Sequence, residues 1–212
     1  MEQLEFVEPN QIEARSFQIL SAELGEHDFD PSTEAVVKRV IHATADFDFA
    51  RTLAFSTDAV QHGVEALRSG AHVVTDTTMV AAGINKRVLA RYGGEVHTFV
   101  ADADVAEEAR RRSITRSAVS MERAADLGAP LVFALGNAPT ALVRLCELLD
   151  EGRLAMPELI IGVPVGFVNV VESKELVMRY AKNYIVARGR KGGSTVAAAI
   201  VNALLYLGSS LR

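Results

Sequence analysis

Five short apolar runs alternate with stretches of helical periodicity along the chain. The runs lie at residues 72–75, 95–100, 131–135, 159–162 and 184–187. Together they are rich in Val, Ile and Leu, which is typical of strands buried on both faces of a parallel sheet. Helices between such strands cover the two faces of the sheet. The pattern therefore predicts an α/β fold with a mainly parallel sheet covered by helices on both faces.

Capping residues and apolar spacing mark the helices between these runs. Residues 10–22 have helical periodicity, and Asp30 can cap a second helix that begins at Pro31 and buries Val36, Val37, Val40 and Ile41 along one face. Ser56 is expected to cap a third helix, which Gly70 ends. Further helices are predicted over residues 82–92, 105–127 with a break near Ser113, 139–149, 173–180 and 195–207.

Length and composition are those of one globular domain, residues 1–212. Hydrophobic residues make up 49% of the chain and charged residues 23%, which excludes a disordered or low-complexity protein. The single Cys146 cannot form an internal disulfide, and a net charge of −5 is unfavourable for binding nucleic acid. The N-terminus lacks the layout of a signal peptide. Polar residues interrupt the uncharged stretch 192–211, so we expect a buried helix there, no contact with a membrane, and a cytoplasmic location.

Charge is unevenly distributed along the sequence. From residue 174 onward there are seven basic residues and one acid, a balance of +6 that leaves −11 for residues 1–173. The basic residues are Lys174, Arg179, Lys182, Arg188, Arg190, Lys191 and Arg212. Such a segment could hold an anionic small molecule, although solvated surface side chains would explain it equally well.

Common catalytic and cofactor motifs are absent from the sequence. There is no G-x-G-x-x-G after a strand, and the segment 188–195 has a lysine and glycines without the spacing of a phosphate-binding loop. His62 and His72 are ten residues apart without a ligand spacing, so we expect ordinary polar roles for both and no metal site.

Four unusual segments follow predicted strands: 75–80, 136–140, 162–167 and 188–194. Ligands of open parallel sheets gather beyond the carboxyl ends of the strands, where glycines let a ligand approach the backbone and free N–H groups at helix starts favour anions. Four such segments on one edge favour a broad pocket for a large anionic ligand, while ordinary tight turns are the plainer interpretation.

Arg39 and His42 are three residues apart and therefore share a helix face. His42 lies near the predicted end of its helix, where the helix dipole favours a positive charge. Such a histidine can donate and recover a proton near neutral pH, although a lone histidine beside an apolar face often only satisfies a hydrogen bond.

As a set, these residues resemble the precorrin-8X methylmutase family, also named cobalt-precorrin-8 methylmutase. The similarity runs in order over nearly the whole chain, and the segments beginning at Gly136 and Gly162 are its most specific parts. The matching segments are Arg15-Ser-Phe17, Arg39-Val-Ile-His42, Asp76-x-x-Met-Val80, Thr115-Arg-Ser-Ala118, Gly136-Asn-Ala-Pro-Thr-Ala-Leu142, Gly162-Val-Pro-Val-Gly-Phe-Val168, Glu172-Ser-Lys174 and Arg188-Gly-Arg-x-Gly-Gly-Ser194.

The resemblance implies a flavodoxin-like domain, a homodimer, no dissociable cofactor, and migration of a methyl group from carbon 11 to carbon 12 of a corrin precursor. It implies that His42 donates and accepts the proton and that Ser16 and Arg39 bind substrate. We expect the anionic tetrapyrrole substrate to contact a further group of residues on the matching segments. These are Arg15, Arg116, Asn137, Gly166, Arg190 and Ser194.

The chemistry of these residues agrees with this implication, since arginines can form bidentate hydrogen bonds with the carboxylates on the rim of a flat macrocycle. An isomerisation leaves the molecular formula unchanged and needs no hydride carrier or methyl donor. Two alternatives stay open: a non-catalytic corrinoid-binding protein, and an α/β enzyme acting on a phosphorylated metabolite. The sequence does not decide whether the substrate contains cobalt.

Overall fold

The computed structural model describes residues 5–209, in which six strands form one sheet in the order β1-β6-β5-β4-β2-β3. The strands are β1 (Leu53–Phe55), β2 (His72–Thr75), β3 (Val96–His97), β4 (Leu131–Leu135), β5 (Leu159–Gly162) and β6 (Tyr184–Ala187). Strands β2 to β6 are all parallel, and β1 pairs antiparallel with β6. The predicted α/β class and mainly parallel sheet are confirmed.

The topology has one point where the strand order reverses. Counted among themselves, the five parallel strands β2 to β6 have the order 2-1-3-4-5, which is that of flavodoxin-like folds, and β1 extends the sheet at one edge. The reversal lies between β2 and β4, whose connections leave in opposite directions. A crevice for a ligand is expected at the carboxyl ends of these two strands.

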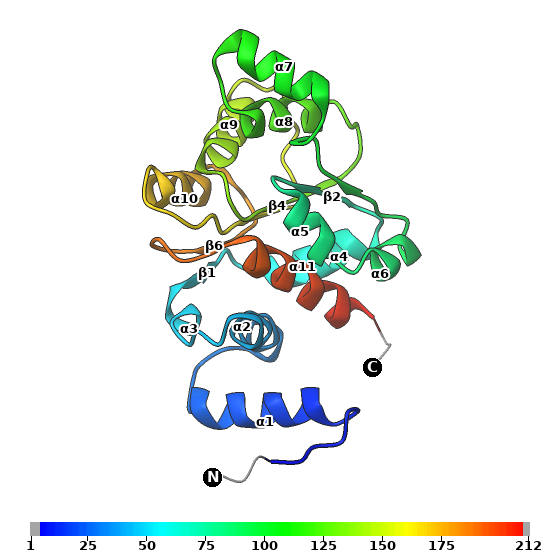
Figure 1. Ribbon diagram of the computed structural model, residues 1–212, viewed down its shortest axis with the longest axis vertical. Helices are drawn as coiled ribbons and strands as arrows, with labels where there is room; N and C mark the ends of the chain where they lie inside the picture. Colours follow the sequence, from blue (N-terminus) through cyan, green and yellow to red (C-terminus); the bar gives the residue numbers. More distant parts are fainter. Residues whose placement is uncertain (1–4, 210–212) are drawn as a thin grey trace.

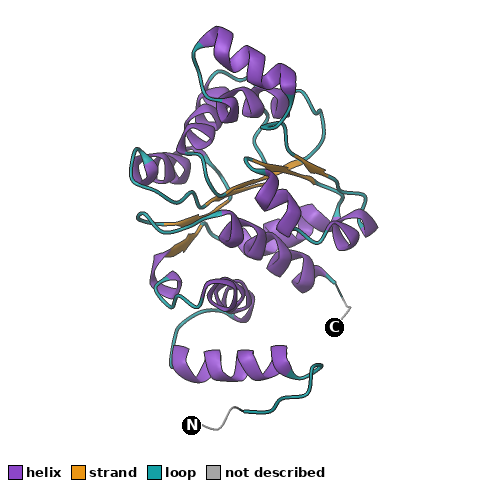
Figure 2. Cartoon of the chain, viewed as in Figure 1, coloured by secondary structure: helices purple, strands orange, loops and turns teal. Residues whose placement is uncertain are grey.

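Helices cover both faces of the sheet, as predicted (Figures 1 and 2). On one side lie α7, α8, α9 and α10; on the other, α4, α5, α6 and α11 come first, then α2 and α3, then α1 (Figure 1). The helices are α1 (Ile12–Leu24), α2 (Pro31–Thr44), α3 (Phe49–Thr52), α4 (Ala59–Arg68), α5 (Thr78–Gly83), α6 (Lys86–Arg91), α7 (Ala103–Arg112), α8 (Arg116–Ala125), α9 (Pro139–Asp150), α10 (Val170–Tyr180) and α11 (Ser194–Gly208).

The sheet divides the hydrophobic core into two parts. Alternation along β2 sends Val73 into the part shared with α2 and α11, and Val74 into the part shared with α8 and α9. The thiol of Cys146 on α9 is buried in this second part, and its burial raises the pKa of Cys146 to about 12. No helix among residues 5–209 is both long enough and apolar enough to cross a bilayer.

Helix α11 is a buried core helix, as expected for residues 195–207. Most of its apolar residues, among them Ile200 and Leu204, are buried against α2, α4 and α5 of the same chain, while Tyr206 and Leu207 near its end are 37% and 38% exposed. The helix therefore leaves no broad apolar face for a second subunit.

Several sequence predictions were right in kind and wrong in extent. The break near Ser113 is confirmed, because Ser113 adopts a left-handed conformation with φ of 53° between α7 and α8. Residues 82–92 form the end of α5 and the separate α6, because the side chain of Asn85 caps a new helix at this point. The strand predicted over 95–100 pairs only at Val96 and His97, since it lies at the edge of the sheet.

Two features of the segment around Ser56 differ from the prediction. Strand β1 was not predicted, because it is only three residues long and follows directly on α3. Ser56 does not cap α4: its hydroxyl accepts the backbone N–H of Tyr184, and Asp58 occupies the cap position.

Candidate active site

A buried carboxylate joins the two loops at the strand-order reversal. Asp76 directly follows β2 and accepts the backbone N–H groups of Gly136, Asn137 and Ala138 at 2.9, 2.7 and 2.7 Å. Its side chain is 1% exposed. Burial raises the pKa of Asp76, and the three backbone donors act in the opposite direction. Asp76 thus holds the loop after β4 in a fixed place beside the loop after β2.

The loops after β5 and β6 reach the same edge. The hydroxyl groups of Thr77 and Ser194 lie 3.0 Å apart, and the N–H of Gly193 donates to the carbonyl of Val163 at 2.8 Å. Gly136 faces Gly193 so closely that a Cβ at residue 136 would lie 2.8 Å from the Gly193 carbonyl oxygen. The four segments predicted to gather at one edge therefore do so.

Lys174 on α10 holds the loop 188–194 in place. The residue is fully buried on α10, and its Nζ donates to the carbonyl oxygens of Gly189 and Lys191 at 2.8 and 2.9 Å. Burial lowers the pKa of Lys174 to about 8. Lys174 therefore serves to position the loop.

Ion pairs within the chain neutralise part of the positive charge of the C-terminal segment. Lys191 Nζ lies 2.6 Å from Asp46 and 2.7 Å from Asp48, and Arg188 lies 3.7 Å from Glu175. Arg212 lies outside the described residues. The bulk positive charge expected of this segment is thus partly neutralised within the chain.

Arg190 remains available to an anion. Its guanidinium lies 5.5 Å from the ring centroid of Phe167, and it has no carboxylate within 4.0 Å among residues 5–209. The Arg190 carbonyl accepts the N–H of Gly166, whose φ of 143° favours glycine. Phe167 and Val168 are 80% and 79% exposed, so an arginine and an apolar surface lie side by side.

Arg116 is held near the same edge by its neighbour Thr115. The Thr115 hydroxyl donates to Thr140 on α9 at 2.9 Å, and the same oxygen caps α8 by accepting the N–H of Ala118. Arg116 and Asn137 both have exposed side chains close to this contact. The predicted substrate-binding residues Arg116, Asn137, Gly166, Arg190 and Ser194 thus lie in the loops and at the helix starts of one edge.

His42 and Arg39 lie in the outer helical layer, on the predicted common face of α2. The exposed imidazole of His42 stacks on Phe17 of α1, with ring centroids 4.9 Å apart and planes 12° apart. The Arg39 guanidinium lies 4.9 Å from the centroid of Phe17 and pairs with Glu13 at 2.7 Å. Helix α2 ends two residues after His42, as predicted.

Ser16 and Arg15 lie on α1 beside Phe17. The Ser16 hydroxyl donates to the carbonyl of Ile12 at 2.9 Å, and Arg15 pairs with Glu5 at 2.7 Å. Phe17 thus brings α1, with Ser16, against Arg39 and His42 of α2, whereas Arg15 pairs with Glu5 on another side of α1.

The structure places the predicted site residues in two groups. One lies between α1 and α2, the other lies at the carboxyl edge of the sheet, and Lys191 connects them by pairing with the residues after α2. Cavities of about 280 and 460 Å³ lie elsewhere, at the start of α2 and beside β1, and contain no predicted site residue. At the edge itself, Met79, Phe167 and Val168 are exposed to solvent.

Sequence reasoning gave Asp76, Lys174 and Phe17 no separate role. A carboxylate directly after a buried strand was a usable signal for Asp76, because that position faces the ligand edge. Lys174 carried no such signal, since its partners are backbone carbonyls that only the fold brings near it.

Comparison with known proteins places this arrangement in a family. A family model of precorrin-8X methylmutases matches residues 11–207. The cobalt-precorrin-8 methylmutase of Priestia megaterium is 46% identical, with 96% of this chain and 90% of that protein covered. The protein of the same name from Salmonella typhimurium is also 46% identical, with 94% and 95% covered.

A solved structure agrees with the sequence match. The crystal structure of a precorrin-8X methyl mutase from Thermus thermophilus superimposes with a TM-score of 0.84 at 40% identity, covering 93% of this chain and 97% of that one. The resemblance expected from the motifs is thus confirmed over nearly the whole length, and the chain is an isomerase. It belongs to the precorrin-8X methylmutase family.

Proposed function

We propose that the chain moves a methyl group from carbon 11 to carbon 12 of a corrin precursor, giving hydrogenobyrinate or its cobalt analogue, cobyrinate. The observation that carries the proposal is the exposed His42, held by Phe17 beside Arg39. The imidazole of His42 is exposed and can exchange a proton with a bound substrate, and the neighbouring guanidinium of Arg39 can bind a carboxylate on the rim of that substrate.

His42 has the role of proton donor and acceptor. Its proton passes to the conjugated macrocycle, which then draws electrons from the bond between carbon 11 and the methyl group. That bond breaks as the bond to carbon 12 forms, and the proton returns to His42. No atom or electron is gained or lost, so His42 needs only access to the ring and a stable orientation.

The open edge of the sheet suits the flat ring and its carboxylates. Met79 at the start of α5 and Phe167 and Val168 in the loop after β5 are exposed apolar side chains, and they can lie against the faces of the macrocycle. Arg116 and Arg190 can meet rim carboxylates, with Asn137, Gly166 and Ser194 beside them. Arg15, Ser16 and Arg39 extend the binding surface towards His42.

The cobalt-containing substrate is the one that we propose. Both of the relatives compared above at 46% identity are named cobalt-precorrin-8 methylmutase, whereas the solved structure at 40% identity is named for precorrin-8X. A higher kcat/KM on cobalt-precorrin-8 than on precorrin-8X would support this choice. The opposite order would contradict it.

We also propose that the protein is a cytoplasmic homodimer. The exposed apolar side chains of α1, Ile12 and Ile19, support a dimer. The free thiol of Cys146 is compatible with a reducing compartment.

The alternatives raised by the sequence receive less support. Lys191 pairs with two carboxylates, and the Gly193 N–H is bonded to Val163, so the loop 188–194 does not present a free phosphate cradle. A purely binding role would leave the proton chemistry of His42 unused.

Replacing His42 tests the reaction directly. In His42→Ala the rate of methyl migration should fall by about 10²–10⁴, the contribution of a positioned acid–base group. Substrate binding should persist, because the carboxylate contacts lie elsewhere. His62→Ala is the matched control and should keep normal turnover. Near-normal turnover in His42→Ala would remove the histidine from the mechanism and leave only binding.

Arg39→Ala and Arg116→Ala separate binding from chemistry. Each should weaken substrate binding by about 10- to 100-fold, as expected for a lost charge-assisted hydrogen bond. A partly amidated substrate should lose less affinity than the native one. Normal binding by both variants would show that the surface has been placed wrongly.

A further inference from the structure

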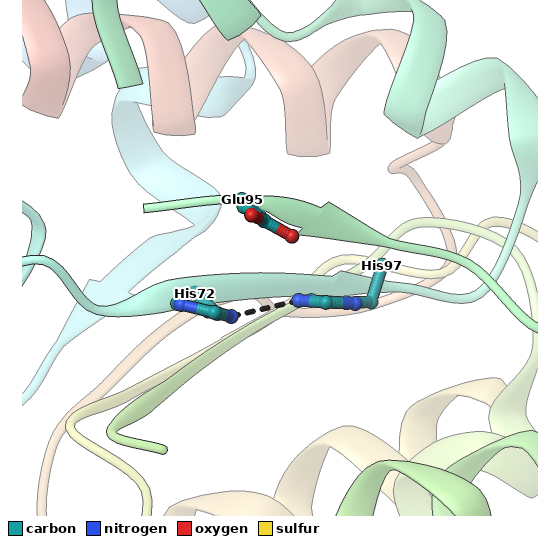
Figure 3. A group of neighbouring side chains, drawn as sticks. All are labelled: His72, Glu95 and His97. Carbon is teal, nitrogen blue, oxygen red and sulfur yellow. Dashed lines mark hydrogen bonds between the residues drawn. The ribbon is translucent and has the colours of Figure 1, made fainter. Parts of the chain in front are cut away.

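Three side chains able to bind a metal, two imidazoles and one carboxylate, meet on the strand pair β2 and β3, and none of them belongs to the site residues assigned above. Val73 pairs with Val96 and Val74 with His97, so His72 stands opposite Glu95 and diagonal to His97. Because side chains alternate along a strand, these three project from one face of the sheet. One ligand atom from each lies within 4.8 Å of the other two (Figure 3).

The two imidazoles face each other through their ring nitrogens. His72 Nδ1 lies 2.7 Å from His97 Nε2, and the ring planes differ by 10° (Figure 3). Such a pair can share one proton between the two nitrogens, whereas a second proton would set two positive charges against each other. Burial lowers the pKa of His97, and the neighbouring His72 lowers it further. The neutral imidazole is the form of histidine that binds metals.

The donor set selects the class of ion. Two imidazole nitrogens and one carboxylate oxygen suit a zinc-type divalent transition metal, while magnesium and calcium prefer oxygen ligands alone. Two nitrogens on a tetrahedral zinc ion lie about 3.3 Å apart, so the rings need to separate by only about 0.6 Å from their present contact. Glu95 is exposed and the histidines are half-buried, which leaves room for water as a fourth ligand.

The cluster lies at the edge of the sheet, on residues without a role in the methylmutase site. His72 is the first residue of β2, roughly 13 Å along the strand from Asp76, whereas His97 pairs with Val74 and lies nearer the carboxyl end of the strand. Strand β3 has only two residues and a single neighbouring strand. A bound ion would therefore link the edge strand to the sheet.

We propose that His72, Glu95 and His97 bind one zinc-type divalent ion, which fastens β3 to β2. An ordinary polar role was predicted for His72. The metal cluster could not be seen in the sequence, because Glu95 and His97 are more than twenty residues away from His72 and only strand pairing brings the three together.

Zinc binding to the untagged, chelator-treated full-length chain tests the proposal. Calorimetry at pH 7.5 should give one Zn²⁺ per chain with micromolar or tighter affinity. His72→Ala and His97→Ala should each weaken binding by about 100-fold, and Glu95→Gln by about 10-fold. The control His62→Ala, which removes a histidine outside the cluster, should bind as the unaltered chain does.

Two further measurements keep the test decisive. Zn²⁺ at 100 times its dissociation constant should raise the Tm by about 5–10 °C in the unaltered chain and not in the histidine variants. Co²⁺ should give the strong visible absorption of a tetrahedral site, which Glu95→Gln should alter even if a histidine variant fails to fold. Methyl migration should continue in the presence of EDTA. Zinc affinity that is unchanged in all three variants, or weaker than millimolar in the unaltered chain, would overturn the proposal.

Discussion

At the scale of single residues, Asp76 holds together the loops after β2 and β4. Its two carboxylate oxygens accept hydrogen bonds from three backbone N–H groups of the loop after β4. In Asp76→Asn, an NH₂ group replaces one of the two acceptor oxygens. Some of the buried backbone N–H groups that it then faces lose their acceptor. We expect the free energy of unfolding to fall by about 3 kcal/mol, since unpaired buried donors cost about 1–3 kcal/mol each. Urea unfolding measures this, with the exposed Asp126→Asn as control. Equal stability of the two variants would contradict the assigned role.

Lys174 gives a pH dependence whose sign follows from its burial. Its pKa is about 8 in the folded protein and 10.5 as an ordinary lysine, so between these values the unfolded chain binds a proton that the folded chain lacks. Raising the pH through this window therefore increases stability, by up to about 3 kcal/mol. The difference in free energy of unfolding between the unaltered chain and Lys174→Met should grow from pH 8 to pH 10.5. A flat or falling difference would refute the assignment.

At the scale of elements, α2 brings His42 and Arg39 to the site, and its start depends on Asp30. The Asp30 carboxylate accepts the hydroxyl of Ser32 and the N–H groups of Ser32 and Thr33, and these bonds, that of the Ser32 hydroxyl above all, hold its pKa well below the usual range. Asp30→Ala should cost about 1 kcal/mol of stability, whereas Asp28→Ala, an exposed aspartate outside the cap, should cost almost nothing. The contribution of Asp30 is present above about pH 4 and is lost as the pH falls further. Thermal unfolding at pH 7 and at pH 3 checks both statements, and the gap between the variants should narrow at pH 3.

Elements with a strong local signal were predictable, and those fixed by distant partners were not. Asp30 and Pro31 give the start of α2 from the sequence alone, and the apolar runs give β4, β5 and β6 within a residue. Strand β1 exists because Leu53 pairs with Ala187, a partner more than a hundred residues away. Ser56 failed as a cap for the same reason, since its hydroxyl serves Tyr184.

The site was predictable to the same degree. Its loops follow strands, so the sequence could place Asn137, Gly166, Arg190 and Ser194 at one edge. It could not show that α1 lies over His42, because the contact through Phe17 depends on how two surface helices pack.

At the scale of the whole molecule, the homodimer remains a prediction, and α1 offers the apolar surface for it. Helix α11 is covered within the chain, whereas Ile12 and Ile19 lie seven residues apart on the outer face of α1 and are 53% and 42% exposed. Light scattering should give twice the chain mass of 22.8 kDa. Ile12→Glu combined with Ile19→Glu should shift the protein towards the monomer, and Gln18→Glu, about 100° away on the helix, should not. A stable monomer mass for the unaltered chain would refute the dimer.

The burial of Cys146 has a practical consequence for following the motions of this protein. Its thiol lies between α9 and the sheet, with a pKa near 12, so the thiol can lose its proton and react with a thiol reagent only when that half of the core opens. Because it is the only cysteine in the sequence, the rate at which the unmodified enzyme is labelled reports how often this part of the core opens. The labelling rate can be measured with and without substrate, and no foreign probe has to be introduced.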